Sequence, residues 1–148
     1  MSEAFLIVDG HSVIFAWTDL HAQHSRNTEL ARETLVRRLV PIHDTLRRTA
    51  VVFDGRGERT TEHLHTTGIK VFYAGGRQSA DHVVERLVAR LGANHDVLVA
   101  TDDRLEQQTV TTFGASWIST AELRDLVDRA ERDVREEIRK RAPRNRPR

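Results

Sequence analysis

Residues 5–9 read FLIVD, four apolar residues closed by an acid, and this pattern returns three times along the chain. The later copies are AVVFD at 50–54, KVFYAGGRQSAD at 70–81 and VLVATDD at 97–103. Short apolar runs rich in Val, Ile and Phe are typical of buried β-strands. If the strands are parallel, each acid lies at or just past a carboxyl end, where open α/β sheets bind their ligands. The four runs therefore predict an α/β fold with an acidic edge.

The apolar runs alternate with longer segments of helical periodicity, an order typical of a mainly parallel sheet. We expect five strands, at 4–8, 50–54, 69–74, 97–101 and 115–118. We expect helices at 28–48, 80–92, around Leu105 and at 120–141. Pro41 interrupts the first of these segments, so that it predicts either one kinked helix or two.

Composition limits the classes of protein that remain. A chain of 148 residues with 39% hydrophobic content is long enough for one domain with a real core and too short for two ordinary ones. The absence of cysteine excludes disulfides, thiolate nucleophiles and cysteine-ligated zinc. Neither a signal peptide nor a membrane-spanning segment is visible. We therefore expect a cytoplasmic protein that does not enter a membrane.

The charge is uneven along the chain. Residues 139–148 hold six Arg or Lys and no acid, so that the net charge of +1 leaves about −5 on the rest. We expect one domain at 1–141 and a basic, disordered tail at 142–148. Such a tail either contacts nucleic-acid phosphates or serves only as a solubilising end.

The acids at the predicted edge raise an electrostatic problem. Two carboxylates ~4 Å apart repel by roughly 4 kcal/mol at an effective dielectric constant near 20, so a cluster requires protons or a cation. Taken singly, each acid has an ordinary structural role as a helix cap or a turn residue. Their common placement at one edge favours a shared site, and we expect Mg²⁺ or Mn²⁺ there.

Five motifs in order resemble those of the YacP-like NYN-domain ribonucleases, a branch of the PIN-like nuclease superfamily. They are LIVDGHSVI, VVFDG, VFYAGGRQSADHVVERL, VATDDRLEQ and GASWISTAEL, which together span about residues 4 to 127. The resemblance implies a three-layer α/β/α PIN-like domain. At the turn that gives the family its name, Gly10-His11-Ser12 stands where Gly-Tyr-Asn is usual.

The resemblance also implies a set of site residues. The catalytic, metal-binding positions fall on Asp9, Asp54, Asp81 and Asp103. Glu85, one turn after Asp81, and Asp102, beside Asp103, are possible further metal ligands. Contacts with the substrate are expected from His11, Ser12, Arg56 and Arg77.

The activity implied is a metal-dependent endoribonuclease that hydrolyses phosphodiester bonds in single-stranded RNA, with mRNA on the ribosome as a candidate target. The cation would activate water and neutralise charge on the phosphate. The resemblance further implies RNA and the ribosome as partners, and pairing into a homodimer is a further expectation.

Two alternatives stay open on the residues alone. The chain has eight histidines, and two of them could act as acid and base in a metal-independent ribonuclease. A domain of the same fold could instead bind RNA or the ribosome without turnover, which the altered Gly10-His11-Ser12 turn suggests. A haloacid-dehalogenase-like phosphatase fits poorly because its second acid would fall at His11. A response-regulator receiver fits poorly because no lysine is placed to serve at a later strand end.

Overall fold

The computed structural model describes residues 3–142. Its strands form a single six-stranded sheet in the order β3-β4-β2-β1-β5-β6, with all neighbouring pairs parallel except the antiparallel pair β3–β4. The strands are β1 (Ala4–Asp9), β2 (Arg48–Asp54), β3 (Thr61–Leu64), β4 (Lys70–Ala74), β5 (Asp96–Ala100) and β6 (Ser116–Ile118). The chain moves outward from β1 to β2 and then returns to the other side of β1 with β5. This reversal makes the carboxyl ends of β1 and β5 the topological switch point of the sheet, a common place for ligands.

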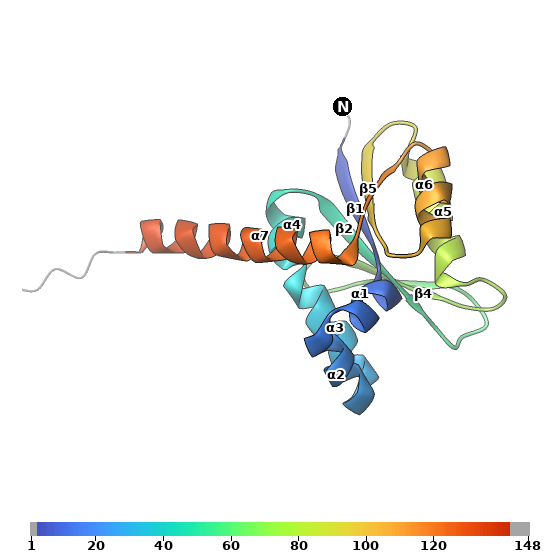
Figure 1. Ribbon diagram of the computed structural model, residues 1–148, viewed down its shortest axis with the longest axis horizontal. Helices are drawn as coiled ribbons and strands as arrows, with labels where there is room; N and C mark the ends of the chain where they lie inside the picture. The colour runs from blue at the N-terminus through green and yellow to red at the C-terminus, as the bar shows by residue number, and fades with distance from the viewer. Residues whose placement is uncertain (1–2, 143–148) are drawn as a thin grey trace, which may run out of the picture.

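The described residues form seven helices, six between strands and α7 after the last strand. They are α1 (Gly10–Ala16), α2 (Thr18–Arg26), α3 (Thr28–Arg38), α4 (Val40–Thr45), α5 (Ala80–Leu91), α6 (Arg104–Thr112) and α7 (Thr120–Arg141). α5 and α6 cover one face of the sheet, whereas α1, α3, α4 and α7 pack on the other, as Figure 1 shows. The fold is therefore a three-layer α/β/α sandwich.

The alternation of side chains along β1 explains the two layers. Leu6 and Val8 point into the core under α1, α3, α4 and α7, while Ile7 points into the core under α5 and α6. All three are almost fully buried. Since successive side chains of a strand point to opposite faces, a run of apolar residues indicates a strand that is covered on both sides.

The structure confirms the expected fold class, and the expected strands agree with β1, β2, β4, β5 and β6 to within two residues at each end. The sheet has one more strand, because the polar segment Thr61–Leu64 pairs with β4 at the sheet edge although its residues are all exposed. The expected segment 28–48 is two helices, α3 and α4, with Pro41 in the first turn of α4. Proline is tolerated there because the first-turn N–H groups have no intrahelical partner.

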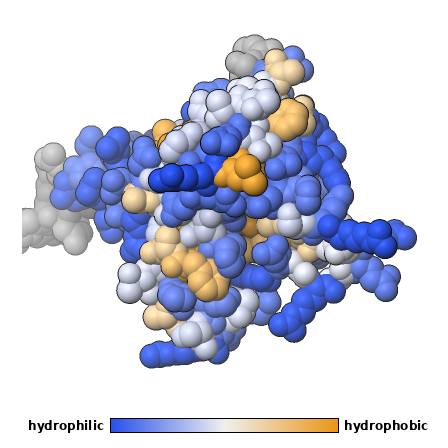
Figure 2. All heavy atoms as spheres, turned by 45° about the vertical axis from the view of Figure 1, so that its right-hand side comes forward, coloured by the Kyte–Doolittle hydropathy of each residue, from blue (hydrophilic) through white to orange (hydrophobic). Residues whose placement is uncertain are grey.

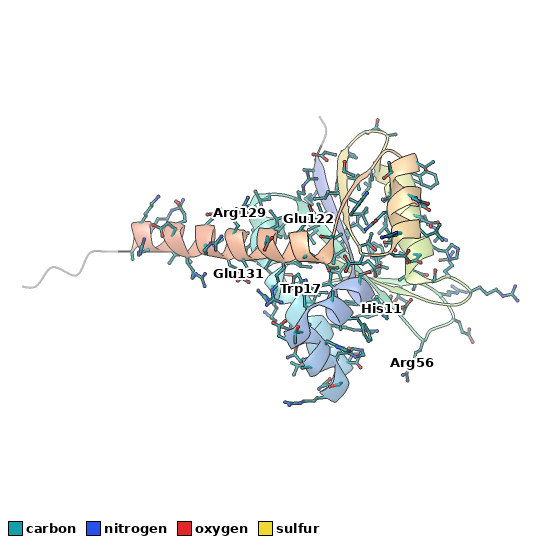
Figure 3. The ribbon with its side chains drawn as sticks, in the orientation of Figure 1. His11, Trp17, Arg56, Glu122, Arg129 and Glu131 are labelled. Carbon is teal, nitrogen blue, oxygen red and sulfur yellow. The ribbon has the colours of Figure 1, made fainter. Side chains whose placement is uncertain are left out.

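The last helix begins next to the predicted acidic edge. Ser119 caps α7, and Glu122 completes a capping box at its start. The indole of Trp17, which is labelled in Figure 3, donates to the Thr120 carbonyl at 3.0 Å. The Arg124 guanidinium lies 4.7 Å from the centre of the Trp17 ring. These contacts hold the start of α7 against the body of the domain.

Beyond its first turns, α7 extends away from the sheet and ends at Arg141 (Figure 1). Most of the tail expected at 142–148 lies outside the described residues, so its expected disorder stays a prediction. Within residues 3–142, no helix is long and apolar enough to cross a membrane. The face drawn in Figure 2 is mostly hydrophilic, and its hydrophobic residues lie in small separate patches.

Gly10 allows α1 to start against β2. A Cβ at this position would lie 2.4 Å from two ring atoms of Phe53 and 2.9 Å from the Val52 carbonyl oxygen. Because the Phe53 ring is itself buried in the core, it cannot swing away. We expect Gly10→Ala to lower the free energy of unfolding by about 1–3 kcal/mol, as overpacking usually does. Urea denaturation monitored by circular dichroism measures this loss.

Gly57 provides the matched control for this substitution. A Cβ there would have the Arg59 carbonyl oxygen as its nearest neighbour, at an ordinary 3.5 Å. Gly57→Ala should therefore unfold near the wild-type urea midpoint. Equal midpoints for the two variants would contradict the close approach of α1 to Phe53.

Candidate metal centre

Asp9 lies at the end of β1, next to β5, and is the N-cap of α1. Its Oδ2 accepts hydrogen bonds from the hydroxyls of Ser12 at 2.8 Å and Thr101 at 3.1 Å. Its Oδ1 accepts from the Ser12 backbone N–H at 3.4 Å. The carboxylate is only 4% exposed. Two neighbouring hydroxyls, 3.4 Å apart, thus hold one oxygen of a buried carboxylate in place.

Asp81 and Glu106 reach Asp9 from the two helices of one layer. Asp81 lies in the first turn of α5, and Glu106 lies in the first turn of α6 on the same buried face as Val110, four residues later. Since both helices follow strands of the same sheet and cover the same face, their N-terminal turns meet at its carboxyl edge. One carboxylate oxygen from each of Asp9, Asp81 and Glu106 lies within 4.8 Å of the other two.

Burial makes this acidic cluster electrostatically unfavourable without a counterion. Burial and the neighbouring carboxyl groups of Asp81 and Asp9 raise the pKa of Glu106 to about 11. Burial also raises the pKa of Asp9, an effect partly offset by its hydrogen bonds to Ser12 and Thr101 and reinforced by the charge of Asp81. In both cases the cost of removing a carboxylate from water is the largest cause.

The two side-chain oxygens of Glu106 are the telling feature. Glu106 is 2% exposed, and within residues 3–142 neither Oε1 nor Oε2 has a hydrogen-bond donor. Buried polar atoms are almost always paired, so an unpaired buried carboxyl group needs an explanation. A divalent cation held by Asp9, Asp81 and Glu106 would supply the missing partner, and hard cations such as Mg²⁺ and Mn²⁺ prefer oxygen ligands of this kind. The donor set therefore fits such a cation.

Two of the expected site residues bond to the first turns of helices in this structure. Asp103 is the N-cap of α6, and its Oδ1 accepts from the backbone N–H groups of Leu105 at 2.9 Å and Glu106 at 3.4 Å. Asp102 accepts from the Thr120 backbone N–H at 2.9 Å and from the Thr120 hydroxyl at 2.7 Å. Asp103 thereby positions the first turn of α6, and Asp102 links the end of β5 to the start of α7.

Asp54 and Glu85 lie outside the cluster of three carboxylates. Asp54 ends β2 and is exposed, and its Oδ1 accepts from the Ala80 backbone N–H at 3.2 Å. It therefore ties β2 to the first residue of α5, directly before Asp81. Glu85 is half-buried one turn further along α5. The structure thus brings Asp9 and Asp81 together and leaves Asp54, Asp103, Asp102 and Glu85 around them.

The residues expected to contact the substrate lie in different parts of the structure. The Ser12 hydroxyl is engaged with Asp9, so it orients a carboxylate. His11 is exposed two residues after Asp9, whereas Arg56 extends from the loop after β2, away from the body of the domain (Figure 3). Arg77 is exposed on the loop before α5. These two loops are joined, because the Gly76 N–H donates to the Gly57 carbonyl at 2.9 Å.

Glu106 was missed as a site residue, although two signals pointed to it. The segment VATDDRLEQ, one of the motifs that resembles the family, contains it at its penultimate position. Its spacing of four from Val110 also places it on the apolar face of its helix, an unusual place for an acid unless it is paired. Either signal would have marked Glu106 as a candidate ligand.

Comparisons with known proteins agree with this geometry. The sequence profile of the YacP-like NYN domain matches residues 6–148. A Bacillus subtilis (strain 168) protein described as uncharacterized protein YacP is 30% identical over 138 residues, which is 91% of this chain and 81% of the relative.

Two crystal structures of Rae1 (YacP) from Bacillus subtilis share the fold. A point mutant superposes with a TM-score of 0.80 at 28% identity, covering 97% of this chain and 86% of the other. A second Rae1 (YacP) structure gives a TM-score of 0.78 at 29% identity, covering 92% and 80% respectively. Sequence and tertiary structure therefore agree on one family.

Proposed function

The chain belongs to the YacP-like NYN family, whose domain has a nuclease-type fold, and from this premise we propose that it is a metal-dependent endoribonuclease acting on single-stranded RNA. The observation that carries the proposal is the meeting of Asp9, Asp81 and Glu106 at one point, with both Glu106 oxygens buried and unpaired. Burying an unpaired carboxyl group lowers the stability of the fold, and a role in metal-assisted phosphodiester hydrolysis would account for its presence.

In this proposal the three carboxylates hold a divalent cation, Mg²⁺ or Mn²⁺. The cation, when bound, would lower the pKa of a water molecule and neutralise charge developing on the phosphate. The chain's own residues orient the site: Ser12 and Thr101 fix the Asp9 carboxylate, and Asp103 sets the first turn of α6 that carries Glu106.

Further residues are assigned to the periphery of the site. Asp54, bonded to the Ala80 N–H, and Glu85, one turn after Asp81, are proposed to contact water or substrate around the centre, and Asp102 supports the start of α7. His11, Arg56 and Arg77 are exposed around the same edge and are proposed to contact the RNA, the arginines through its phosphates. A messenger RNA on the ribosome is the proposed natural target.

The test is cleavage of an end-labelled single-stranded RNA by the purified protein. We expect cleavage with Mn²⁺ or Mg²⁺ and none with EDTA, because in this proposal the cation activates the water and neutralises charge on the phosphate. A parallel reaction uses ribosomes carrying the same RNA as a translated message. Cleavage that persists in EDTA would contradict the proposal and favour histidine chemistry, for which His11, exposed two residues after Asp9, is the candidate.

The second candidate is a domain that binds RNA or the ribosome without cutting. The observation in its favour is the Gly10-His11-Ser12 turn, which departs from the family pattern, with Ser12 engaged with Asp9. This candidate would be established if the protein binds RNA or ribosomes but cleaves neither free nor ribosome-bound RNA with any metal. The same result would contradict the nuclease proposal.

A further inference from the structure

We infer that the surface between α1, α2 and α3, beside Asp54, is a subsite for one nucleotide of single-stranded RNA. The base would stack on Phe15, and a phosphate would contact Arg32. We call it the Phe15 subsite, formed by His11, Phe15, His24, Arg32 and Asp54, which line one small hollow. The inference rests on the proposed function, since it names where the substrate of that activity is held.

Phe15 is placed to receive a flat ring. It follows the buried residues Val13 and Ile14 on α1, yet its own side chain is 45% exposed. Its ring lies 4.4 Å from the ring of His11, 5.0 Å from His21 and 5.1 Å from His24, measured between ring centres. A single exposed phenylalanine is unremarkable. Four rings packed at the surface form an aromatic patch of the kind on which bases stack.

Arg32 supplies the cation on the other side of the hollow. Its guanidinium donates to the Asp54 carbonyl at 2.9 Å and lies over the rings of Phe53, at 5.0 Å, and Tyr73, at 5.6 Å. These contacts fix the side chain, which is 21% exposed. An arginine has five N–H donors in a rigid fork, so a group held in this way keeps donors for a phosphate. Glu29 is its paired acid, at a distance of 4.0 Å.

A second, wider hollow continues from the first. It shares Arg32 and Asp54 and is lined further out by Arg56, Arg59 and Tyr73. A strand crossing both hollows would therefore meet the aromatic patch, then Arg32, then the exposed arginines after β2. Alternating aromatic and cationic side chains are the usual means of binding single strands, because each nucleotide offers a ring and a phosphate.

The chemistry also excludes a double-stranded occupant. The faces of paired bases are stacked on one another inside a duplex, so they cannot reach Phe15, whereas unpaired bases can be splayed onto aromatic side chains. Asp54 lies at the junction of the two hollows and is bonded to the first residue of α5, one residue before Asp81. The bound nucleotide would thus lie next to the carboxylate centre.

The test measures the affinity of a short fluorescent single-stranded RNA in EDTA, by fluorescence anisotropy. Phe15→Ala should raise the Kd about 5- to 150-fold, since stacking is worth about 1–3 kcal/mol per base. Phe15→Tyr keeps the ring, so its Kd should stay near that of wild type. Phe15→Leu keeps an apolar side chain without a ring, so its Kd should rise, which separates stacking from packing. The control is Phe113→Ala, because Phe113 is similarly exposed, at 47%, at the opposite end of α6 from Glu106.

Two further readouts sharpen the result. Replacing one nucleotide of the RNA by an abasic one should weaken wild-type binding and leave Phe15→Ala binding unchanged. Arg32→Gln should lower the slope of log Kd against log salt by about 0.7, the value for one phosphate contact on a single strand. Arg129→Gln, on the exposed face of α7, should leave the slope unchanged.

The outcomes separate this inference from the proposed function. Wild-type protein that cleaves RNA, with equal Kd values for Phe15→Ala and Phe113→Ala, would overturn the Phe15 subsite and leave the nuclease intact. Wild-type protein that neither binds nor cleaves any RNA would overturn both.

Discussion

We expect the Glu106→Gln variant to lose RNA cleavage by a factor of about 10³ or more. Glutamine has nearly the same shape as glutamate, but its amide cannot offer two anionic oxygens to a cation. A cation that stabilises charge in phosphoryl transfer contributes several kcal/mol, and about 4 kcal/mol corresponds to 10³ in rate. Single-turnover cleavage of end-labelled RNA in saturating Mn²⁺ measures the loss.

Stability distinguishes loss of the metal site from loss of the fold. In metal-free wild type the folded protein keeps a proton on Glu106 up to a pKa of about 11, whereas the unfolded chain releases it near 4.5. The folded state therefore binds the extra proton, and the free energy of unfolding falls as pH rises through this window, by about 1.4 kcal/mol per pH unit. Glu106→Gln removes this dependence. In EDTA, the free energy of unfolding of the variant relative to that of wild type should therefore rise by about 3 kcal/mol between pH 6 and pH 8.

Added Mn²⁺ should make wild type more stable than Glu106→Gln, the reverse of their order in EDTA. A cation that binds only the folded wild type raises its Tm, and the variant should show little or no rise. Asp133→Asn is the control, because Asp133 is an exposed acid on α7, far from the centre. Cleavage by Glu106→Gln at the wild-type rate would contradict the assignment of Glu106 as a metal ligand. A rise in Tm on adding Mn²⁺ as large as the rise seen for wild type would contradict it as well.

The second large effect is expected at Asp9, and it should exceed the effect at Asp103. Asp9→Asn removes the buried charge at the centre of the cluster and should abolish measurable cleavage, again by about 10³-fold or more. The fold should persist, because an asparagine carbonyl still accepts from the Ser12 backbone and its amide can donate to the hydroxyl oxygens of Ser12 and Thr101.

Asp103→Asn is a demanding comparison for Asp9→Asn. Asparagine is as good an N-cap as aspartate, so the first turn of α6 and the position of Glu106 should be kept. We expect this variant to retain at least about a tenth of wild-type activity, a loss of about 1.4 kcal/mol or less in transition-state stabilisation, and a wild-type urea midpoint. A loss at Asp103 as complete as the loss at Asp9 would mean that Asp103 is itself a ligand.

The type of most elements was readable from the sequence because it depends on local chemistry, although the helices α1 and α2 were not among those expected. Apolar runs such as FLIVD and VLVA are typical of strands covered on both faces, and the stripe along residues 120–141 is helical by its own periodicity. The strand Thr61–Leu64 was not readable. Its polar residues pair with β4 through backbone groups at the sheet edge, so the side chains carry no apolar signal.

The sequence by itself determined a three-layer α/β fold with acids at the carboxyl ends of its strands, and it was sufficient to place Asp9 and Asp81 at one edge. Only the tertiary structure decided which acids share a point in space. The order of strands and the phase of α5 and α6 bring Glu106 to Asp9 and Asp81, while the same geometry turns Asp103 and Asp102 toward backbone N–H groups. Distances between side chains of separate elements depend on how those elements pack, and no local pattern encodes them.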